Sequence, residues 1–150
     1  MAHTFTHLLY HVVFGTKNRH PFMDKDLTER LFPYLGGIIR ELGGTALTIG
    51  GMPDHTHLLV SLPPTLAVAD VLRVVKTNSS RWVHETWPER RTFAWQAGYG
   101  AFSVSRSNED AVARYIANQE EHHRRISFEE EFIALLKKHG ISYDPRYLWQ

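Results

Sequence analysis

Hydrophobic and polar positions follow two periods along this chain, and together they predict a β-α-β-β-α-β-α order of elements. Residues 6–14 are rich in β-branched and aromatic side chains, which favours a strand. In residues 65–86 the apolar side chains recur every three or four positions, as on one face of a helix. The predicted strands are 6–14, 45–50, 55–62 and a fourth that glycines interrupt, made of 93–96 and 99–104. The predicted helices of this order are 24–42, 65–86 capped by Thr65, and one capped by Ser107 or Asn108; another helix follows at 127–139, with a capping box at Ser127.

This order of elements predicts an α+β fold, a ferredoxin-like antiparallel sheet with helices on one face. The strands at 45–50 and 55–62 form the expected hairpin, joined by a turn at 52–54. The sequence contains no repeat, low-complexity tract or linker, and 150 residues suit a single domain. We therefore expect one domain over residues 1–150.

Two histidines, His55 and His57, stand one residue apart at the start of a predicted strand. Residues i and i+2 of a strand share a face, so the two imidazoles project side by side while Thr56 faces the other way. Such a pair forms half of a site for a divalent metal. The alternative is a pair of histidines on a polar face of the sheet.

Tyr115 and Gln119 are four residues apart in a predicted helix, so they lie one turn apart on one face. A phenol acts as a nucleophile when a cation assists it, and an amide oxygen suits Mg²⁺ or Mn²⁺ alongside imidazole. The alternative is a tyrosine that fills the core or an interface. Together with the histidine strand, the two residues indicate metal-assisted phosphoryl transfer through a phosphotyrosine.

Five segments, in this order, resemble the small single-tyrosine HUH transposases of bacterial insertion sequences, a family related to the REP-associated tyrosine transposases. The family has a His-hydrophobic-His strand and a tyrosine on a later helix. Thr56 departs from this pattern, although threonine suits a strand and its hydroxyl could bond locally. The five segments are 10–19 (YHVVFGTKNR), 51–59 (GMPDHTHLL), 72–81 (LRVVKTNSSR), 95–105 (WQAGYGAFSVS) and 115–119 (YIANQ).

The resemblance implies Tyr115 as the nucleophile and His55, His57 and Gln119 as ligands of Mg²⁺ or Mn²⁺. It implies single-stranded DNA as the substrate, hairpin recognition at the element's ends, and a 5′-phosphotyrosine with a free 3′-hydroxyl. It also implies a homodimer. Related transposases combine the histidines of one subunit with the tyrosine helix of its partner, and the sequence leaves open whether Tyr115 acts in its own subunit or in the partner's. The ferredoxin-like sheet agrees with the same resemblance.

The net charge of +1 gives little support for a nucleic-acid partner, but the charge is unevenly distributed. Residues 1–107 contain 11 Lys and Arg against 8 Asp and Glu, whereas residues 108–150 contain 6 against 8. Basic side chains in the first part are candidates for phosphate contacts, with solvated surface charge as the alternative. The DNA-binding candidates are Lys17, Arg19, Lys76, Arg81 and Arg106.

Other polar residues near these motifs receive structural interpretations. We expect His122 and His123 to be exposed or to contact phosphate rather than to bind the metal. The acidic run at 129–131 fits the N-terminal charge of a helix. Asp54, next to His55, could orient that imidazole or simply belong to a turn.

Composition favours a cytoplasmic protein without a membrane partner. The chain has no cysteine, which excludes disulfides and thiolate metal sites. No apolar run approaches the roughly 20 residues that span a bilayer, and the first residues lack a signal-peptide pattern.

Two other functions remain compatible with the sequence. One is a module that binds DNA hairpins without chemistry, and the other is a metal-dependent hydrolase that uses His55 and His57 with water as nucleophile. A Tyr115→Phe variant separates them, because only the transposase needs the tyrosine hydroxyl for cleavage.

Overall fold

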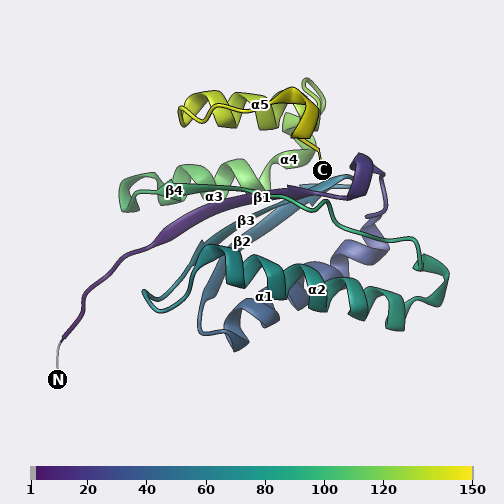
Figure 1. The fold of residues 1–150 in the computed structure, drawn as a ribbon, viewed down its shortest axis with the longest axis horizontal. Coiled ribbons are helices and arrows are strands. Elements are labelled where there is room, and N and C mark those ends of the chain that lie inside the picture. The colour runs from purple at the N-terminus through teal and green to yellow at the C-terminus, as the bar shows by residue number, and fades with distance from the viewer. Residues whose placement is uncertain (1–2, 150) are drawn as a thin grey trace.

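A four-stranded antiparallel sheet organises the protein, seen in a computed structural model that describes residues 3–149 (Figure 1). Its strands run in the order β2-β3-β1-β4, so the predicted ferredoxin-like α+β topology is confirmed. The strands are β1 (Leu9–Gly15), β2 (Thr45–Met52), β3 (His55–Ser61) and β4 (Gly100–Val104). The helices are α1 (Lys25–Glu41), α2 (Val68–Thr86), α3 (Glu109–Ala117), α4 (Gln119–His122) and α5 (Phe128–Lys138).

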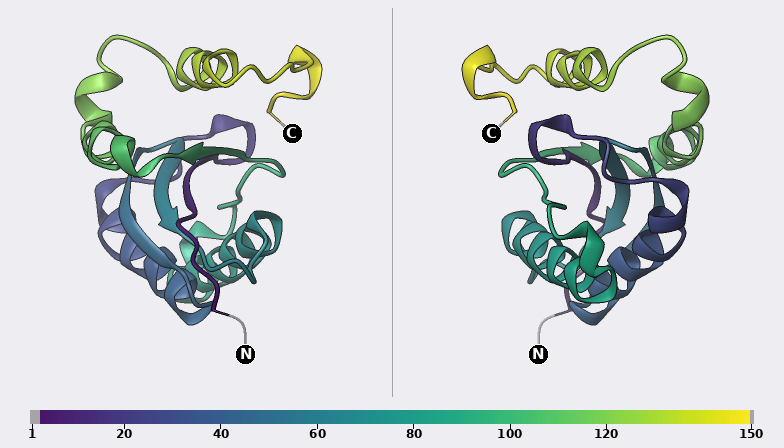
Figure 2. Two further views of the ribbon diagram at one scale, coloured as in Figure 1. Left: turned by 90° about the vertical axis from the view of Figure 1, so that its left-hand side faces the viewer. Right: turned by 90° about the vertical axis from the view of Figure 1, so that its right-hand side faces the viewer.

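Helices lie on both faces of the sheet (Figures 1 and 2). Helices α1 and α2 cover one face and form the main core with Val12 and Phe14 of β1, but the expectation that all helices lie on one face was wrong. Helices α3, α4 and α5 lie across the opposite face, where Val13 packs with Phe102 and with the apolar side of α5. Because successive β1 side chains are buried in both directions, the strand needs cover on both faces.

Local sequence signals explain where several helices begin. The Asp24 side chain accepts a hydrogen bond of 2.9 Å from the Leu27 N–H at the start of α1. The predicted capping box of α5 is confirmed, because Ser127 and Glu130 exchange bonds between side chain and backbone. At the other end of α1, Gly43 takes a φ of 102°, which glycine adopts without strain.

Two other predicted features were wrong. Thr65 does not cap α2, which begins at Val68 after Ala67 without a side-chain cap. Residues 93–96 form no full strand, because only a single bridge joins Trp95 to Thr16. Trp95 instead packs against Phe14 and Phe93, so aromatic packing in the core accounts for the apolar pattern there.

Within residues 3–149, none of the helices combines the length and the hydrophobicity that a bilayer crossing requires.

Candidate active site

The two histidines of β3 are buried near one end of the sheet and face α3, α4 and α5. Both residues are 0% exposed, and His57 pairs in register with Gly50 of β2 and Val13 of β1. Thr56 points the other way, and its hydroxyl donates a 3.1 Å bond to the Gly50 carbonyl oxygen. The predicted sharing of one face by His55 and His57 is therefore seen, and Thr56 satisfies its hydroxyl locally.

Gly50 allows the tyrosine helix to lie against the sheet. A Cβ at this position would stand 2.4 Å from the carbonyl oxygen of Ile116, closer than side-chain atoms normally approach. Ile116 follows Tyr115 in α3 and is buried. The absence of a side chain at Gly50 therefore lets the helix lie close enough to the sheet for Tyr115 and Gln119 to reach the histidines.

The tyrosine helix is interrupted, whereas the sequence predicted a continuous one. Helix α3 ends at Ala117, Asn118 leaves the helical conformation with φ −102° and ψ 26°, and α4 begins at Gln119. Tyr115 and Gln119 are nevertheless neighbours, as expected for residues one turn apart, because the Gln119 amide nitrogen donates to the Tyr115 carbonyl oxygen over 3.3 Å. The Gln119 Oε1 accepts a 3.1 Å bond from His55 Nε2, so the structure brings these residues together.

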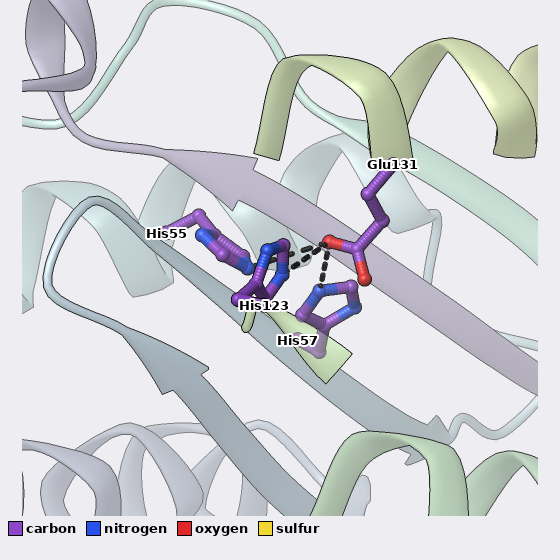
Figure 3. A group of neighbouring side chains, drawn as sticks. All are labelled: His55, His57, His123 and Glu131. Carbon is purple, nitrogen blue, oxygen red and sulfur yellow. Dashed lines mark hydrogen bonds and ion pairs between the residues drawn. The ribbon is translucent and has the colours of Figure 1, made fainter. Parts of the chain in front are cut away.

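A buried carboxylate from α5, Glu131, lies at the centre of the cluster (Figure 3). Its Oε1 is 2.9 Å from His57 Nε2, 3.1 Å from His123 Nε2 and 3.4 Å from His55 Nε2. Its Oε2 accepts a hydrogen bond from the Tyr115 hydroxyl. One donor atom from each of the three histidines and from Glu131 lies within 4.8 Å of all the others, which is close enough for one metal ion.

The expected exposure of His123 was wrong, whereas the acidic run at 129–131 lies in the first turn of α5 as expected. The His123 side chain is only 6% exposed and bonds to both Gln119 and Glu131, and Glu131 itself is 1% exposed. His122 is more exposed at 28%, and its Nε2 lies 3.2 Å from the Tyr115 hydroxyl. A signal for Glu131 exists in the sequence, because it shares the helical face of Phe128 and Phe132.

Each strand histidine has a partner for its second ring nitrogen. His55 Nδ1 lies 2.7 Å from Asp54 Oδ1, a contact that fits the orienting role considered for Asp54 from the sequence. His57 Nδ1 lies 2.8 Å from Nε2 of His11, a β1 residue that the sequence motifs did not single out. Both contacts direct Nε2 toward the centre of the cluster, as such partners do for metal-binding histidines.

Burial and hydrogen bonding set the charges of the cluster. Burial opposes ionisation of Glu131, but bonds to His123, His55 and His57 hold the pKa of its carboxyl far below the usual range. Burial and the bond to Glu131 raise the pKa of the Tyr115 hydroxyl. Burial lowers the pKa of His11 to about 3, so this imidazole is neutral. The cluster therefore holds a carboxylate beside a protonated tyrosine.

The five basic DNA-binding candidates come from three parts of the chain, the turn after β1, helix α2 and the turn after β4, and three of them have internal partners. Arg19 lies 2.6 Å from Glu129 and over the Trp149 ring. Lys76 donates to the carbonyl oxygens of residues 96–98, and burial lowers its pKa to about 8. Arg81 donates to the Asn78 side-chain oxygen over 3.2 Å and is exposed, as are Lys17 and Arg106.

A cavity of about 500 Å³ opens beside the tyrosine. It lies between β4, α3 and α5, and its wall includes Tyr115, His122 and Glu131 together with Phe102 and Lys138. The hydroxyl of Tyr115 therefore has space next to it for part of a substrate.

Comparison with known proteins gives the family. The model of the IS200-like transposases matches residues 4–119. The chain is 28% identical over 117 residues to the ISDra2 transposase TnpA of Deinococcus radiodurans, covering 75% of this chain and 84% of that protein. It is 27% identical over 128 residues to the transposase for insertion sequence element IS200 of Salmonella typhimurium, covering 79% and 81%.

Two solved structures share the fold. A crystal structure from Deinococcus radiodurans R1, assigned as a transposase, superposes with a TM-score of 0.64 at 25% identity over 79% of this chain and 95% of that one. A REP-associated tyrosine transposase bound to a REP hairpin superposes with a TM-score of 0.60 at 14% identity, over 82% and 74%. The family model covers well over half of the sequence, and the chain belongs to the IS200-like transposase family.

Proposed function

We propose that this transposase cuts and rejoins single-stranded DNA at the ends of an insertion sequence through a 5′-phosphotyrosine on Tyr115. One observation carries the proposal: the Tyr115 hydroxyl reaches the same buried cluster that contains His55 and His57. The cavity beside the hydroxyl supports the proposal, because a scissile phosphate needs space at that oxygen.

The proposed cleavage is a transfer of the phosphoryl group from a sugar to the tyrosine. The Tyr115 oxygen forms a bond to phosphorus, and the bond from phosphorus to the 3′ oxygen breaks. The tyrosine gives up its proton and the departing 3′ oxygen takes one up, so no water is consumed. Attack of a DNA 3′-hydroxyl on the aryl phosphate ester reverses the step and rejoins strands.

The donor atoms fit Mg²⁺ or Mn²⁺. His55 Nε2, His57 Nε2 and Gln119 Oε1 are imidazole and amide donors on one side of the buried cluster. When bound, a divalent ion polarises the scissile phosphate and offsets the charge that develops on it. Asp54 and His11 hold the two imidazoles with Nε2 toward that position.

Single-stranded DNA, folded into hairpins at the element ends, is the proposed partner. The REP-associated relative in complex with a REP hairpin supports this choice. Lys17, Arg81 and Arg106 are exposed and available for phosphate contacts. We also propose a homodimer, following the family resemblance.

The test is a covalent capture assay. The protein is incubated with labelled single-stranded DNA from the flanks of its own gene, with Mg²⁺ or Mn²⁺, and the products are separated on a denaturing gel. We expect a metal-dependent protein–DNA adduct in the wild type and none in Tyr115→Phe. A Tyr143→Phe variant serves as the matched control and retains the adduct, because Tyr143 packs in a separate cluster with α5.

The other outcomes select the alternative functions. Cleavage that persists in Tyr115→Phe would identify a hydrolase that uses water. Shifted but uncut DNA in both proteins would identify a hairpin-binding module.

A further inference from the structure

We infer that Glu131 is an additional metal ligand that also positions the nucleophile, with Oε1 on the ion and Oε2 on the Tyr115 hydroxyl. The inference rests on the proposed function and extends it to α5. Helix α5 lies outside residues 4–119, the part of the chain that the family model matches. The active site would then include a residue that the family comparison does not cover.

The spacing of the donor atoms matches the coordination shell of a small divalent ion. Ligands about 2.1 Å from an octahedral Mg²⁺ lie about 3.0 Å from their neighbours in the shell. Glu131 Oε1 lies 2.9 Å from His57 Nε2 and 3.4 Å from His55 Nε2. Small movements of these side chains would therefore let an ion bind between them with Glu131 in place.

The charge of a divalent ion gives a second reason to expect Glu131 among its ligands. His55, His57 and Gln119 are neutral when they bind a metal, so they offset none of the charge of a buried divalent ion. Glu131 is the carboxylate among the grouped donors, and it is 1% exposed. A buried carboxylate is costly unless it is paired or binds a metal. His123 Nε2 lies 3.1 Å from Glu131 Oε1, so this histidine would lie next to Glu131 in the metal site.

The two oxygens of Glu131 have different partners, and this difference supports the positioning role. Oε1 faces the imidazoles, whereas Oε2 accepts from the Tyr115 hydroxyl and lies 3.0 Å from His122 Nε2. One rigid carboxylate therefore fixes the distance between the metal position and the attacking oxygen. The capping box at Ser127 and the packing of Phe128 and Phe132 hold the helix that carries it.

The test compares Mn²⁺ binding by wild type, Glu131→Gln and Glu120→Gln, measured by calorimetry without DNA. The Glu131→Gln change keeps the shape of the side chain and removes its charge, and Glu120 provides the same charge change at an exposed position beside Gln119. We expect Mn²⁺ affinity to fall at least tenfold in Glu131→Gln and to stay within twofold of wild type in Glu120→Gln. Equal or tighter binding by Glu131→Gln would overturn the inference, because the carboxylate would then be occupying the metal's place.

A second measurement does not depend on a variant. Crystals of the wild type with Mn²⁺ give an anomalous peak that locates the ion. A peak within bonding distance of Glu131 Oε1 supports the inference, and it decides the question if Glu131→Gln does not fold. A peak bound to His55, His57 and Gln119 with Glu131 turned away overturns it.

The outcomes separate this inference from the proposed function. Wild type that forms the Tyr115 adduct while Glu131→Gln binds Mn²⁺ normally refutes the role of Glu131 alone. Wild type that binds Mn²⁺ through Glu131 but forms no adduct refutes the transposition chemistry and leaves the metal site standing.

Discussion

Replacing Gly50 by alanine tests whether close contact between α3 and the sheet assembles the active site. The added Cβ would lie 2.4 Å from the Ile116 carbonyl oxygen, whereas ordinary contact begins at 3.4 Å. Helix α3 must therefore move by about 1 Å, since the neighbouring atom belongs to the backbone and cannot rotate away. Overpacking of this kind costs about 1–3 kcal/mol of stability.

The same movement displaces Tyr115 and Gln119 from the strand histidines. A misplacement of about 1 Å at a reacting group can reduce a rate about 100-fold. We expect Gly50→Ala to lower the free energy of unfolding in urea by about 1–3 kcal/mol, and to slow adduct formation by about two orders of magnitude at saturating DNA and Mn²⁺.

Gly37→Ala is the matched control. The nearest atom to its Cβ would be an Arg40 side-chain nitrogen at 4.0 Å, so nothing is displaced. Within α1 the alanine is expected to be neutral or stabilising by up to about 1 kcal/mol. Wild-type stability and wild-type adduct formation in Gly50→Ala would refute the argument that this contact sets the position of α3.

Three further substitutions test other contacts. His11→Phe removes the partner of His57 Nδ1, so Mn²⁺ affinity in calorimetry should fall about 10–100-fold, and an unchanged affinity would exclude an orienting role. Ser127→Ala removes the capping box of α5 and should cost about 1 kcal/mol in urea unfolding. Asp24→Ala should cost about 1 kcal/mol at pH 7, mainly through the lost cap of α1, since its ion pair with Arg90 is exposed. Bonds from Arg90 and the Leu27 N–H lower the pKa of Asp24 below its usual 3.8. The charge-dependent part of its stabilisation is therefore present above pH 3.8, and the difference from Asp24→Ala should shrink as the pH falls below that value.

The sequence alone predicted those parts of the site whose geometry depends on local spacing. The His55–His57 pair follows from the two-residue period of a strand, and the relation of Tyr115 to Gln119 follows from the turn of a helix. The order of elements likewise predicted the sheet, because short connections restrict how consecutive elements can pair. The roles of these four residues in catalysis and metal binding stay predictions.

The remaining parts of the cluster depend on contacts between distant segments. Glu131 meets His57 across 74 positions and His11 meets the same histidine across 46, so no local period reveals either contact. The Glu131 contact forms because α5 returns over the face of the sheet opposite α1 and α2, whereas the His11 contact forms because β1 pairs with β3. The position of Glu131 between Phe128 and Phe132 marks it as facing inward, but it does not identify what it faces.

The contacts of Arg19 have a consequence for how DNA binding should respond to salt. Its guanidinium already bonds to Glu129 and covers Trp149, so a phosphate that binds Arg19 must replace a carboxylate rather than a hydration shell. Binding there would release a counterion from the DNA, but it would leave the Glu129 charge to attract a new cation. The ion uptake and release nearly cancel, so Arg19 would contribute little to the salt dependence of binding even if it touches the DNA.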